Sequence, residues 1–351
     1  MTDAVKRHTL KLLGLSPLVL QAQRLLAADA PLTRIAFGSC LHQDKPQPIW
    51  EAVLAARPEL FIFLGDNIYG DSDDPAELAA KYAQLAAQPG FAALRANAAV
   101  VATWDDHDYG RNDAGEEYPA KEASRALFLD FWNEAQDSPR RSRTDGIPAA
   151  QVFGPPGQRV QVILPDLRWN RTPLRMVTAG AAWNAREMAD MGPYEPDPSP
   201  AARMLGEAQW QWLEEQFRQP AELRILASSL QALANFTGWE AWANFPSERE
   251  RLLQLLESAT DSVNLVISGD VHWCEYSLLR RAGQGRALAE LTASGLTETW
   301  DKISPNEFRT GSAYAVPNFG FIEIEWLDRQ PILHLSARTL DTTALFEYQY
   351  P

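Results

Sequence analysis

Short apolar runs alternate with helix-like segments from residue 32 to the end of the chain. Such runs, bounded by turn residues, are typical of strands, and a 3.6-residue spacing of apolar positions is typical of surface helices. Because helical segments separate most of the runs and the last runs are closely spaced, we predict an α/β fold with a parallel core and antiparallel pairing late in the chain. The expected strands are Thr33–Phe37, Leu60–Leu64, Ala98–Thr103, Val160–Leu164, Leu223–Ala227, Leu265–Ser268, Leu288–Ala293, Gly320–Trp326 and Ile332–Ala337.

Two helices carry recognisable start signals. Asp74–Glu77 combines a capping Asp, a Pro at the first helical position and an acid in the first turn. Ser247–Glu250 has the spacing of a capping box. Gly154–Gly157 and Gly192–Pro200 are rich in Gly and Pro and lie between strand-like segments, so we expect loops there.

The amino-terminal segment, residues 1–30, differs from the rest of the chain. Lys6–His8 is a small basic head, Leu10–Leu20 is mostly apolar, and Ala28–Ala30 has the small-x-small form of a cleavage site. The segment resembles a twin-arginine export signal with Lys in place of the first Arg, which predicts a periplasmic or secreted protein. The alternative is an amphipathic helix on a cytoplasmic protein. The apolar run is too short for a membrane span, and we expect residues 31–351 to form one domain.

Charge and composition exclude several classes of protein. The 351 residues include 46 acidic and 32 basic side chains, a net charge of −14, without a run of Lys or Arg. This balance argues against a protein that binds nucleic acid by neutralising phosphates. The chain has five His and two Cys, so any metal site must rely largely on carboxylates.

Polar clusters follow four of the expected strands. They are Gly38–Cys40, Gly65–Tyr69, Trp104–Asp108 and Ser268–His272. Ligands of open parallel sheets bind beyond the carboxyl ends of the strands. Because all four clusters contain groups that can bind metals, we predict one shared site.

Each cluster also has a structural explanation. Asp often caps a helix or turn, a buried Cys often packs as a small apolar side chain, and Tyr is often a core residue. Capping does not account for the acids around His107, nor for the pair Asp270 and His272, which project to one side of the chain. Gly65 and Gly269 precede the acids and suit sharp turns in which the backbone approaches an ion or ligand closely. The alternative is an ordinary strand-ending turn.

Five segments together resemble the PhoD-like alkaline phosphatases and phosphodiesterases, a branch of the calcineurin-like, purple-acid-phosphatase-like metallophosphoesterases. The segments are Phe37–Cys40, Gly65–Tyr69, Trp104–Asp113, Leu164–Arg171 and Ser268–Trp273. The resemblance implies a four-layer αββα sandwich, in which two packed mixed β-sheets are flanked by helices. It also implies a metal-dependent hydrolase that acts on phosphate monoesters, diesters or both.

The resemblance implies a dinuclear or trinuclear metal centre, with Fe3+ and Ca2+ as the expected ions and Zn2+, Mn2+ or Mg2+ as alternatives. Asp66 would bridge two metals. Cys40, Tyr69 and His272 would complete the iron site, because thiolate and phenolate are electron-donating ligands that suit iron better than magnesium.

The second metal position would be built from oxygen ligands, which favour a hard cation such as Ca2+. The resemblance implies Asp270 together with either Asp106 or Asn112. A purple-type site would add a His from another strand, but the corresponding segment of this chain, Leu226–Asn235, contains none. Gln231 is the expected substitute, in a substrate-binding role.

The implied reaction is in-line attack on phosphorus by a metal-bound hydroxide. His107 would protonate the leaving-group oxygen, with Asp105 or Asp108 orienting its ring. Arg168 would bind the phosphate through a bidentate fork. The alternative for Arg168 is an ion pair with Asp166. The partner is therefore a phosphate-ester small molecule.

Two other classes of function remain alternatives. Amidohydrolases also place Asp and His at strand ends, but they require a His-x-His pair near the first strand, where this chain has Gly38–Cys40. A non-catalytic module could bind its ligand through tryptophans such as Trp183, Trp239 and Trp242. Asp71–Asp74 is expected to be a solvated turn.

Overall fold

The computed structural model describes residues 30–178, 180–235, 237–282 and 285–350. The expected export segment lies outside these residues, apart from Ala30. Two six-stranded mixed sheets form the centre of the molecule, with strand orders β12-β11-β10-β1-β2-β3 and β4-β5-β6-β7-β9-β8. The strands are β1 (Arg34–Gly38), β2 (Leu60–Leu64), β3 (Ala99–Thr103), β4 (Ala149–Phe153), β5 (Val160–Leu164), β6 (Leu223–Ala227), β7 (Val263–Ser268), β8 (Cys274–Leu279), β9 (Leu288–Ala293), β10 (Phe319–Leu327), β11 (Gln330–Arg338) and β12 (Ala344–Tyr350).

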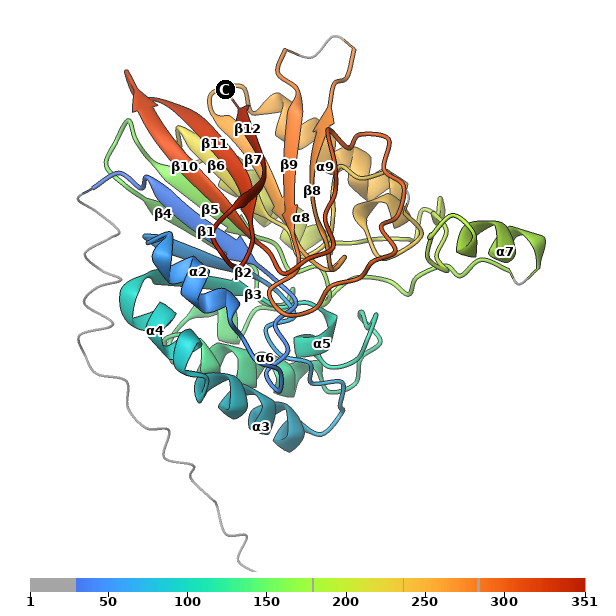
Figure 1. Ribbon diagram of the computed structural model, residues 1–351. Helices are drawn as coiled ribbons and strands as arrows, with labels where there is room; N and C mark the ends of the chain where they lie inside the picture. The colour runs from blue at the N-terminus through green and yellow to red at the C-terminus, as the bar shows by residue number, and fades with distance from the viewer. Residues whose placement is uncertain (1–29, 179, 236, 283–284, 351) are drawn as a thin grey trace, which may run out of the picture.

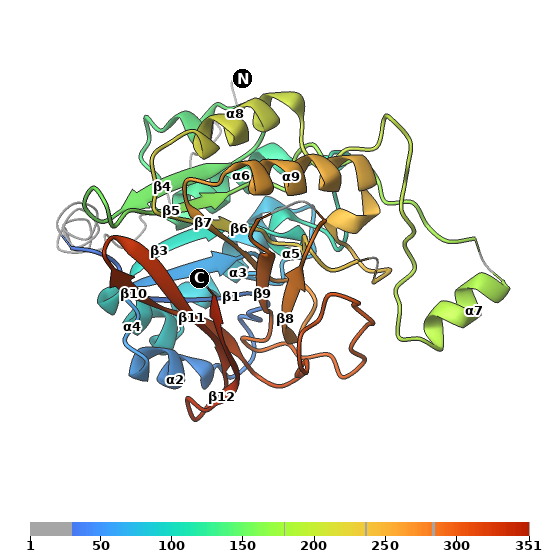
Figure 2. The same cartoon turned by 90° about the horizontal axis from the view of Figure 1, so that it is seen from above.

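Helices cover the outer faces of both sheets and give the predicted four layers (Figure 2). The helices are α2 (Ile49–Ala55), α3 (Pro75–Ala86), α4 (Pro89–Asn97), α5 (Asp106–Tyr109), α6 (Lys121–Phe131), α7 (Ala181–Glu187), α8 (Glu207–Phe217) and α9 (Pro246–Ser258), with 3-10 turns η1 (Pro139–Arg141) and η2 (Trp242–Asn244). Helices α2, α3, α4 and α6 lie against the first sheet, and α8 and α9 lie against the second.

Strand β2 shows how the sequence specifies these layers. Its residues are all buried, and successive side chains point to opposite faces. Leu60, Ile62 and Leu64 join the apolar core between the two sheets, whereas Phe61 and Phe63 join the core beneath the helices. A strand buried on both faces reads as a continuous apolar run, which is why this segment could be recognised from the sequence.

The strand predictions are confirmed at every expected place, and the structure adds β4, β8 and β12. Parallel pairing joins β1, β2 and β3, and also β5, β6, β7 and β9, while β10, β11 and β12 pair antiparallel. Asp74 caps α3 as predicted, since its side chain accepts a hydrogen bond from the Ala76 amide at 2.8 Å. The Ser247 cap is wrong, because α9 begins earlier, at Pro246.

The carboxyl ends of β1, β2 and β3 meet those of the second sheet at one edge of the sandwich, near α5 (Figure 1). Helix α7 projects from the body on a long connection between β5 and α8. Within the described residues, we find no helix with the length and apolar character needed to cross a membrane.

Candidate metal centre

Turns at the carboxyl strand ends carry the predicted ligands. Cys40, Asp66, Asp270 and His272 all have left-handed backbones, with φ of 62°, 50°, 71° and 65°. This conformation costs a non-glycine residue about 1 kcal/mol or more and persists where the surroundings hold it. Gly65 has φ of +99°, and a Cβ there would lie 2.4 Å from the Asp105 Cβ. This turn therefore requires glycine, because its backbone lies against Asp105; the approach to an ion or ligand stays a prediction.

The residues expected at the iron site lie together. The ligand atoms of Cys40, Asp66 and His272 are all within 4.8 Å of one another. The Cys40 Sγ lies 3.4 Å from Asp66 Oδ2, and the Tyr69 hydroxyl lies 3.1 Å from His272 Nε2. The His42 ring stacks on Tyr69, with centroids 4.9 Å apart. A thiol, a carboxylate, a phenol and an imidazole therefore converge on one point.

The acids expected at the second position adjoin this group. Asp66 forms a further close group with Asp106 and His107, and Asp106 forms another with Asp105 and Asp270. Asp66 and Asp106 thus each belong to more than one group of ligand-bearing atoms. The two Asp106 oxygens accept hydrogen bonds from the backbone amides of His107, at 2.9 Å, and Asp113, at 2.6 Å.

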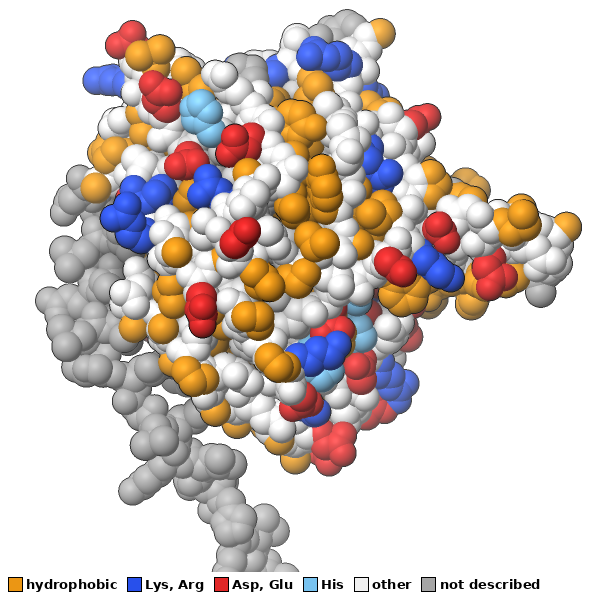
Figure 3. All heavy atoms as spheres, viewed as in Figure 1, with side chains coloured by type: hydrophobic (Ala, Val, Ile, Leu, Met, Phe, Trp, Pro, Cys, Tyr) orange, Lys and Arg blue, Asp and Glu red, His pale blue; other side chains and the backbone are white. Residues whose placement is uncertain are grey.

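A cavity of about 160 Å³ opens onto these groups. Both alternatives for the second ligand, Asp106 and Asn112, line it. Its full lining is Asp66, Asp106, His107, Asn112, Asp113, Trp239, Glu240, Asp270, Val271, His272, Trp273 and Trp300. In Figure 3, histidine side chains gather among charged ones at the lower right of the body, beneath the projecting segment with α7.

The electrostatics of the cluster fit bound cations. Burial raises the pKa of the Cys40 thiol to about 12, and burial together with neighbouring negative groups raises the pKa of Asp66 and Asp270 well above their usual range. Burial lowers the pKa of His272 to about 4, which keeps its imidazole neutral, the form that binds metals. Asp66 Oδ1 is buried without a hydrogen-bond partner among the described residues. Positive ions would offset this repulsion and satisfy this oxygen.

His107 is paired with Asp71, which was assigned from the sequence only to a solvated turn. Its Nδ1 lies 2.7 Å from Asp71 Oδ1, so Asp71 contacts the ring although its side chain is exposed as predicted. Burial opposes a charge on His107, but the carboxylates of Asp106 and Asp66 outweigh it and raise the pKa of the imidazole to about 11. These carboxylates favour the protonated form of the ring, which lies at the cavity wall.

Arg168 lies behind the cavity rather than in its lining. Its guanidinium is fully buried, contacts Asp105, and donates a hydrogen bond to Glu240 Oε2 at 2.6 Å. Asp166 accepts a hydrogen bond from the backbone amide of Arg168, at 2.9 Å, and not from its side chain. The surroundings of the Arg168 guanidinium therefore differ from both expectations, phosphate binding and an ion pair with Asp166. Its nitrogen atoms contact the buried carboxylates of Asp105 and Glu240 instead.

Asp105 and Gln231 also have surroundings that differ from those expected. Asp105 contacts Arg168 and accepts a hydrogen bond from the Ser229 hydroxyl at 2.9 Å, whereas Asp71 takes the position beside the His107 ring. Gln231 donates to Glu275 and Thr292 in the interior of the second sheet, at 2.6 and 3.1 Å, and does not line the cavity.

Sequence reasoning missed Asp113, Glu240 and Trp300, which line the cavity. Asp113 lies inside a recognised motif, but nothing in its spacing marks it. Glu240 and Trp300 lie on loops without a motif. The only available signal for Glu240 was the pair Arg168 and Arg171, since a buried arginine requires a carboxylate partner.

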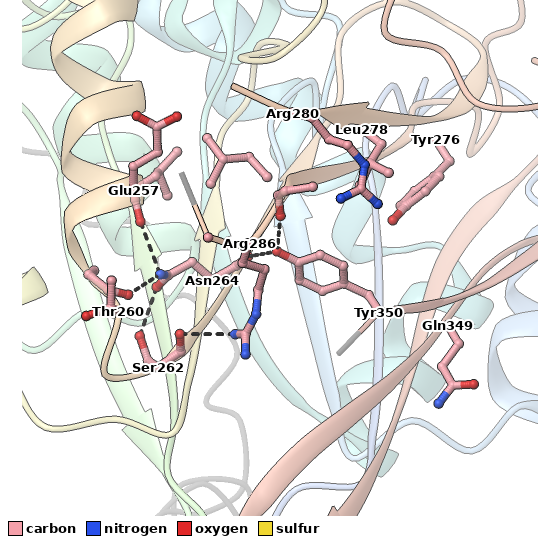
Figure 4. Close-up of a pocket in the computed structure, with 15 residues that line it drawn as sticks. Glu257, Thr260, Ser262, Asn264, Tyr276, Leu278, Arg280, Arg286, Gln349 and Tyr350 are labelled. Atoms are coloured by element: carbon pink, nitrogen blue, oxygen red, sulfur yellow. Dashed lines mark hydrogen bonds between the residues drawn. The ribbon is translucent and has the colours of Figure 1, made fainter. Parts of the chain in front are cut away.

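A cavity larger than the one at the candidate site lies at the opposite end of the second sheet (Figure 4). Its volume is about 610 Å³, and its walls include the start of β7 and the ends of α9, β8 and β12. The Tyr350 hydroxyl lies 2.8 Å from the Ala287 carbonyl oxygen and 3.1 Å from that of Asn264. Among the described residues, the groups that could hold a metal lie at the other cavity.

Comparisons with known proteins agree with this architecture. The solved structure described as "Structure of PhoD" matches 93% of this chain and 72% of its own, with a TM-score of 0.64 and 17% identity. GAP50, the anchor in the inner membrane complex of Plasmodium, matches 91% of this chain and 88% of its own, with a TM-score of 0.57 and 11% identity. At these identities the likeness shows a shared fold. A search of curated proteins finds no match.

The sequence also matches a family model directly. The model describes PhoD-like phosphatases and aligns with residues 35–324, which include every strand-end cluster described above. The match extends over well more than half of the chain, so this chain belongs to the PhoD-like phosphatase family.

Proposed function

We propose that the protein hydrolyses phosphate esters, monoesters or diesters, in the cavity at the carboxyl strand ends, with the help of bound metal ions. Membership of the PhoD-like phosphatase family supports phosphoesterase activity. The single observation that carries the metal dependence is the set of close ligand groups in which Asp66 and Asp106 recur. A carboxylate with two oxygens can serve two neighbouring ions.

Two ions would share this ligand set. One would be held by Cys40, Tyr69, Asp66 and His272, a donor set that suits Fe3+. The other would be held by oxygen ligands suited to Ca2+, namely Asp66, Asp270 and either Asp106 or Asn112. When bound, such ions supply Lewis acidity, which acidifies water and offsets the charge of the phosphate.

The remaining residues act on the substrate and on one another. The His107 ring donates a hydrogen bond or proton to the leaving-group oxygen through Nε2, since Nδ1 is paired with Asp71. Arg168 is a positioning residue. Its guanidinium pairs with Asp105 and Glu240 behind the cavity, and its Nη2 lies 3.8 Å from Asp106 Oδ1. This pairing holds Asp106 in place from its buried side.

Asp66→Ala tests the proposal most directly. We expect its kcat/KM for p-nitrophenyl phosphate and bis(p-nitrophenyl) phosphate to fall by about 1,000-fold or more, because metal assistance contributes several kcal/mol. Elemental analysis should show reduced metal content. Asp341→Ala, in the exposed turn between β11 and β12, is the matched control and should retain both properties. Turnover that survives in Asp66→Ala would refute the metal-dependent mechanism.

Cys40→Ser tests the assignment of the iron ligand. A hydroxyl is a weaker donor than a thiolate, so we expect selective loss of iron with calcium retained. Unchanged iron content would overturn the role given to Cys40.

Retention of ligand affinity after chelation, without turnover, would instead favour a binding module. The amidohydrolase alternative requires a closed barrel, which differs from the two open sheets of this fold.

A further inference from the structure

Part of the lining of the site cavity is apolar. Trp239, Val271, Trp273 and Trp300 line it beside the acidic residues. The indoles of Trp239 and Trp300 meet edge to face, with centroids 6.0 Å apart and planes at 67°. The cavity therefore combines a charged region that suits a phosphate with an aromatic region that suits a different chemical group.

Hydrogen bonds fix the backbone of Trp300 and the indole of Trp239 near the candidate ligands. The backbone amide of Trp300 donates to the His272 carbonyl oxygen at 3.0 Å. The Trp239 Nε1 donates to Ser304 Oγ at 3.1 Å. Behind Trp239, the backbone amide of Gly192 donates to the Thr237 carbonyl oxygen at 3.2 Å, which ties this loop to the segment before α8.

The exposure of Trp300 distinguishes it from the tryptophans of the core. Its exposed fraction is 43%, whereas that of Trp242 is 0%. Trp242 packs edge to face on Trp210 beneath the second sheet, so burial explains it. Burial does not explain an indole that is exposed at a cavity and whose backbone amide bonds to the carbonyl oxygen of a candidate metal ligand.

We propose that Trp239 and Trp300 form an aromatic platform for the leaving group, so that the protein prefers phosphate esters whose alcohol carries a planar aromatic ring. This inference rests on the proposed function and specifies its substrate class. Indole faces bind planar rings by stacking, and their edges favour edge-to-face contact. With the phosphate among the acidic residues and their ions, the esterified alcohol extends over the platform.

Three phosphate monoesters test the platform: benzyl, cyclohexylmethyl and ethyl phosphate. All three are esters of primary alcohols, so the ratio of their kcat/KM values reports mainly on the leaving-group site. We expect Trp300→Ala to lower kcat/KM for benzyl phosphate about tenfold relative to ethyl phosphate. Trp300→Phe should restore most of the ratio, and cyclohexylmethyl phosphate should lose less than benzyl phosphate.

Trp183→Ala is the matched control, because Trp183 lies on α7 and does not line the cavity. It should leave all three rates unchanged. Equal losses on the three esters in Trp300→Ala would assign this residue a structural role and overturn the platform. A larger loss on cyclohexylmethyl phosphate than on benzyl phosphate would also overturn it, in favour of an unspecific apolar contact.

A binding measurement separates this inference from the proposed function. If the metal-loaded protein hydrolyses none of the esters, the proposed function fails. Calorimetric titration with phenylphosphonate and ethylphosphonate then tests the platform alone. Preference for phenylphosphonate that Trp300→Ala abolishes would support it, and equal affinities in the unsubstituted protein would overturn it.

Discussion

The two cavities at opposite ends of the second sheet differ in how their polar groups are satisfied. In the larger one, the Tyr350 hydroxyl reaches two carbonyl oxygens, and the side-chain amide of Asn264 donates to the Ala259 carbonyl oxygen at 2.7 Å. In the smaller one, Asp66 Oδ1 is a buried oxygen without a partner among the described residues, and like charges surround it. The site at which we propose the chemistry is therefore marked by unsatisfied charge, and not by the volume of its cavity.

Removal of metal ions should have the largest effect, because activity is proposed to depend on ions bound at the smaller cavity and not on the larger cavity. We expect chelation with EDTA followed by dialysis to reduce phosphatase activity about 1,000-fold or more, because ions provide the main positive charge near the phosphate. Readdition of Fe3+ and Ca2+ should restore it. The measurement is turnover of p-nitrophenyl phosphate alongside metal content. Full activity in metal-free protein would contradict the difference drawn between the cavities.

Arg168→Met should cause the largest loss of stability. The substitution leaves Asp105 buried without its cation and Glu240 with Arg171 alone, and breaking a buried ion pair in this way costs about 3–5 kcal/mol. Urea denaturation would measure the change in the free energy of unfolding. Arg280→Met, at the exposed edge of the larger cavity, is the matched control and should change stability by less than about 0.5 kcal/mol. Similar losses in the free energy of unfolding for both substitutions would show that the two cavities do not differ in the importance of their charged groups.

His107→Gln should lower kcat for ethyl phosphate about 100-fold, the usual contribution of a general acid. The loss for p-nitrophenyl phosphate should be smaller, since its leaving group needs little protonation. Steady-state kinetics with both substrates would measure the difference. A uniform loss would indicate that His107 acts on binding or folding instead. Asp71→Asn, which keeps the ring partner but removes its charge, serves as an intermediate variant.

Tyr350→Phe should have the smallest effect and only on stability. It removes one hydroxyl from the larger cavity and costs about 1 kcal/mol. Urea denaturation should detect this loss, while kcat/KM should not change. A decrease in kcat/KM would show that the larger cavity is coupled to the site and would overturn the comparison.

The strands that could be predicted from the sequence are those whose buried residues form a short apolar run. Strand β4 was missed because only Phe153 among its residues is fully buried. Strand β8 was missed because it carries Glu275 and Ser277 into the interior, where Gln231 and Asn306 satisfy them. A buried polar residue with a distant partner produces no local signal.

The same distinction applies to the site. Cys40, Asp66 and His272 were predicted to lie together because each follows a strand and parallel strands share an edge. Glu240 and Trp300 reach the cavity from loops, whose course depends on contacts with remote segments. Arg168 was located correctly at its strand end, but the direction of its side chain depends on Asp105 and Glu240, from other parts of the chain.

Assembly of the site from both sheets has a consequence for the order of folding. The Cys40 Sγ lies 3.1 Å from the hydroxyl of Ser294, which is 254 positions further along the chain. The same sulfur lies 3.6 Å from the carbonyl oxygen of Asp270, a candidate ligand that follows β7 and is 230 positions further along. A growing polypeptide therefore cannot complete the candidate ligand set until β7 has been made and the second sheet has packed on the first. Contacts so distant in sequence form slowly, because a long loop must close first. Ion capture should thus mark the end of folding, and a bound ion would hold the two sheets together against unfolding.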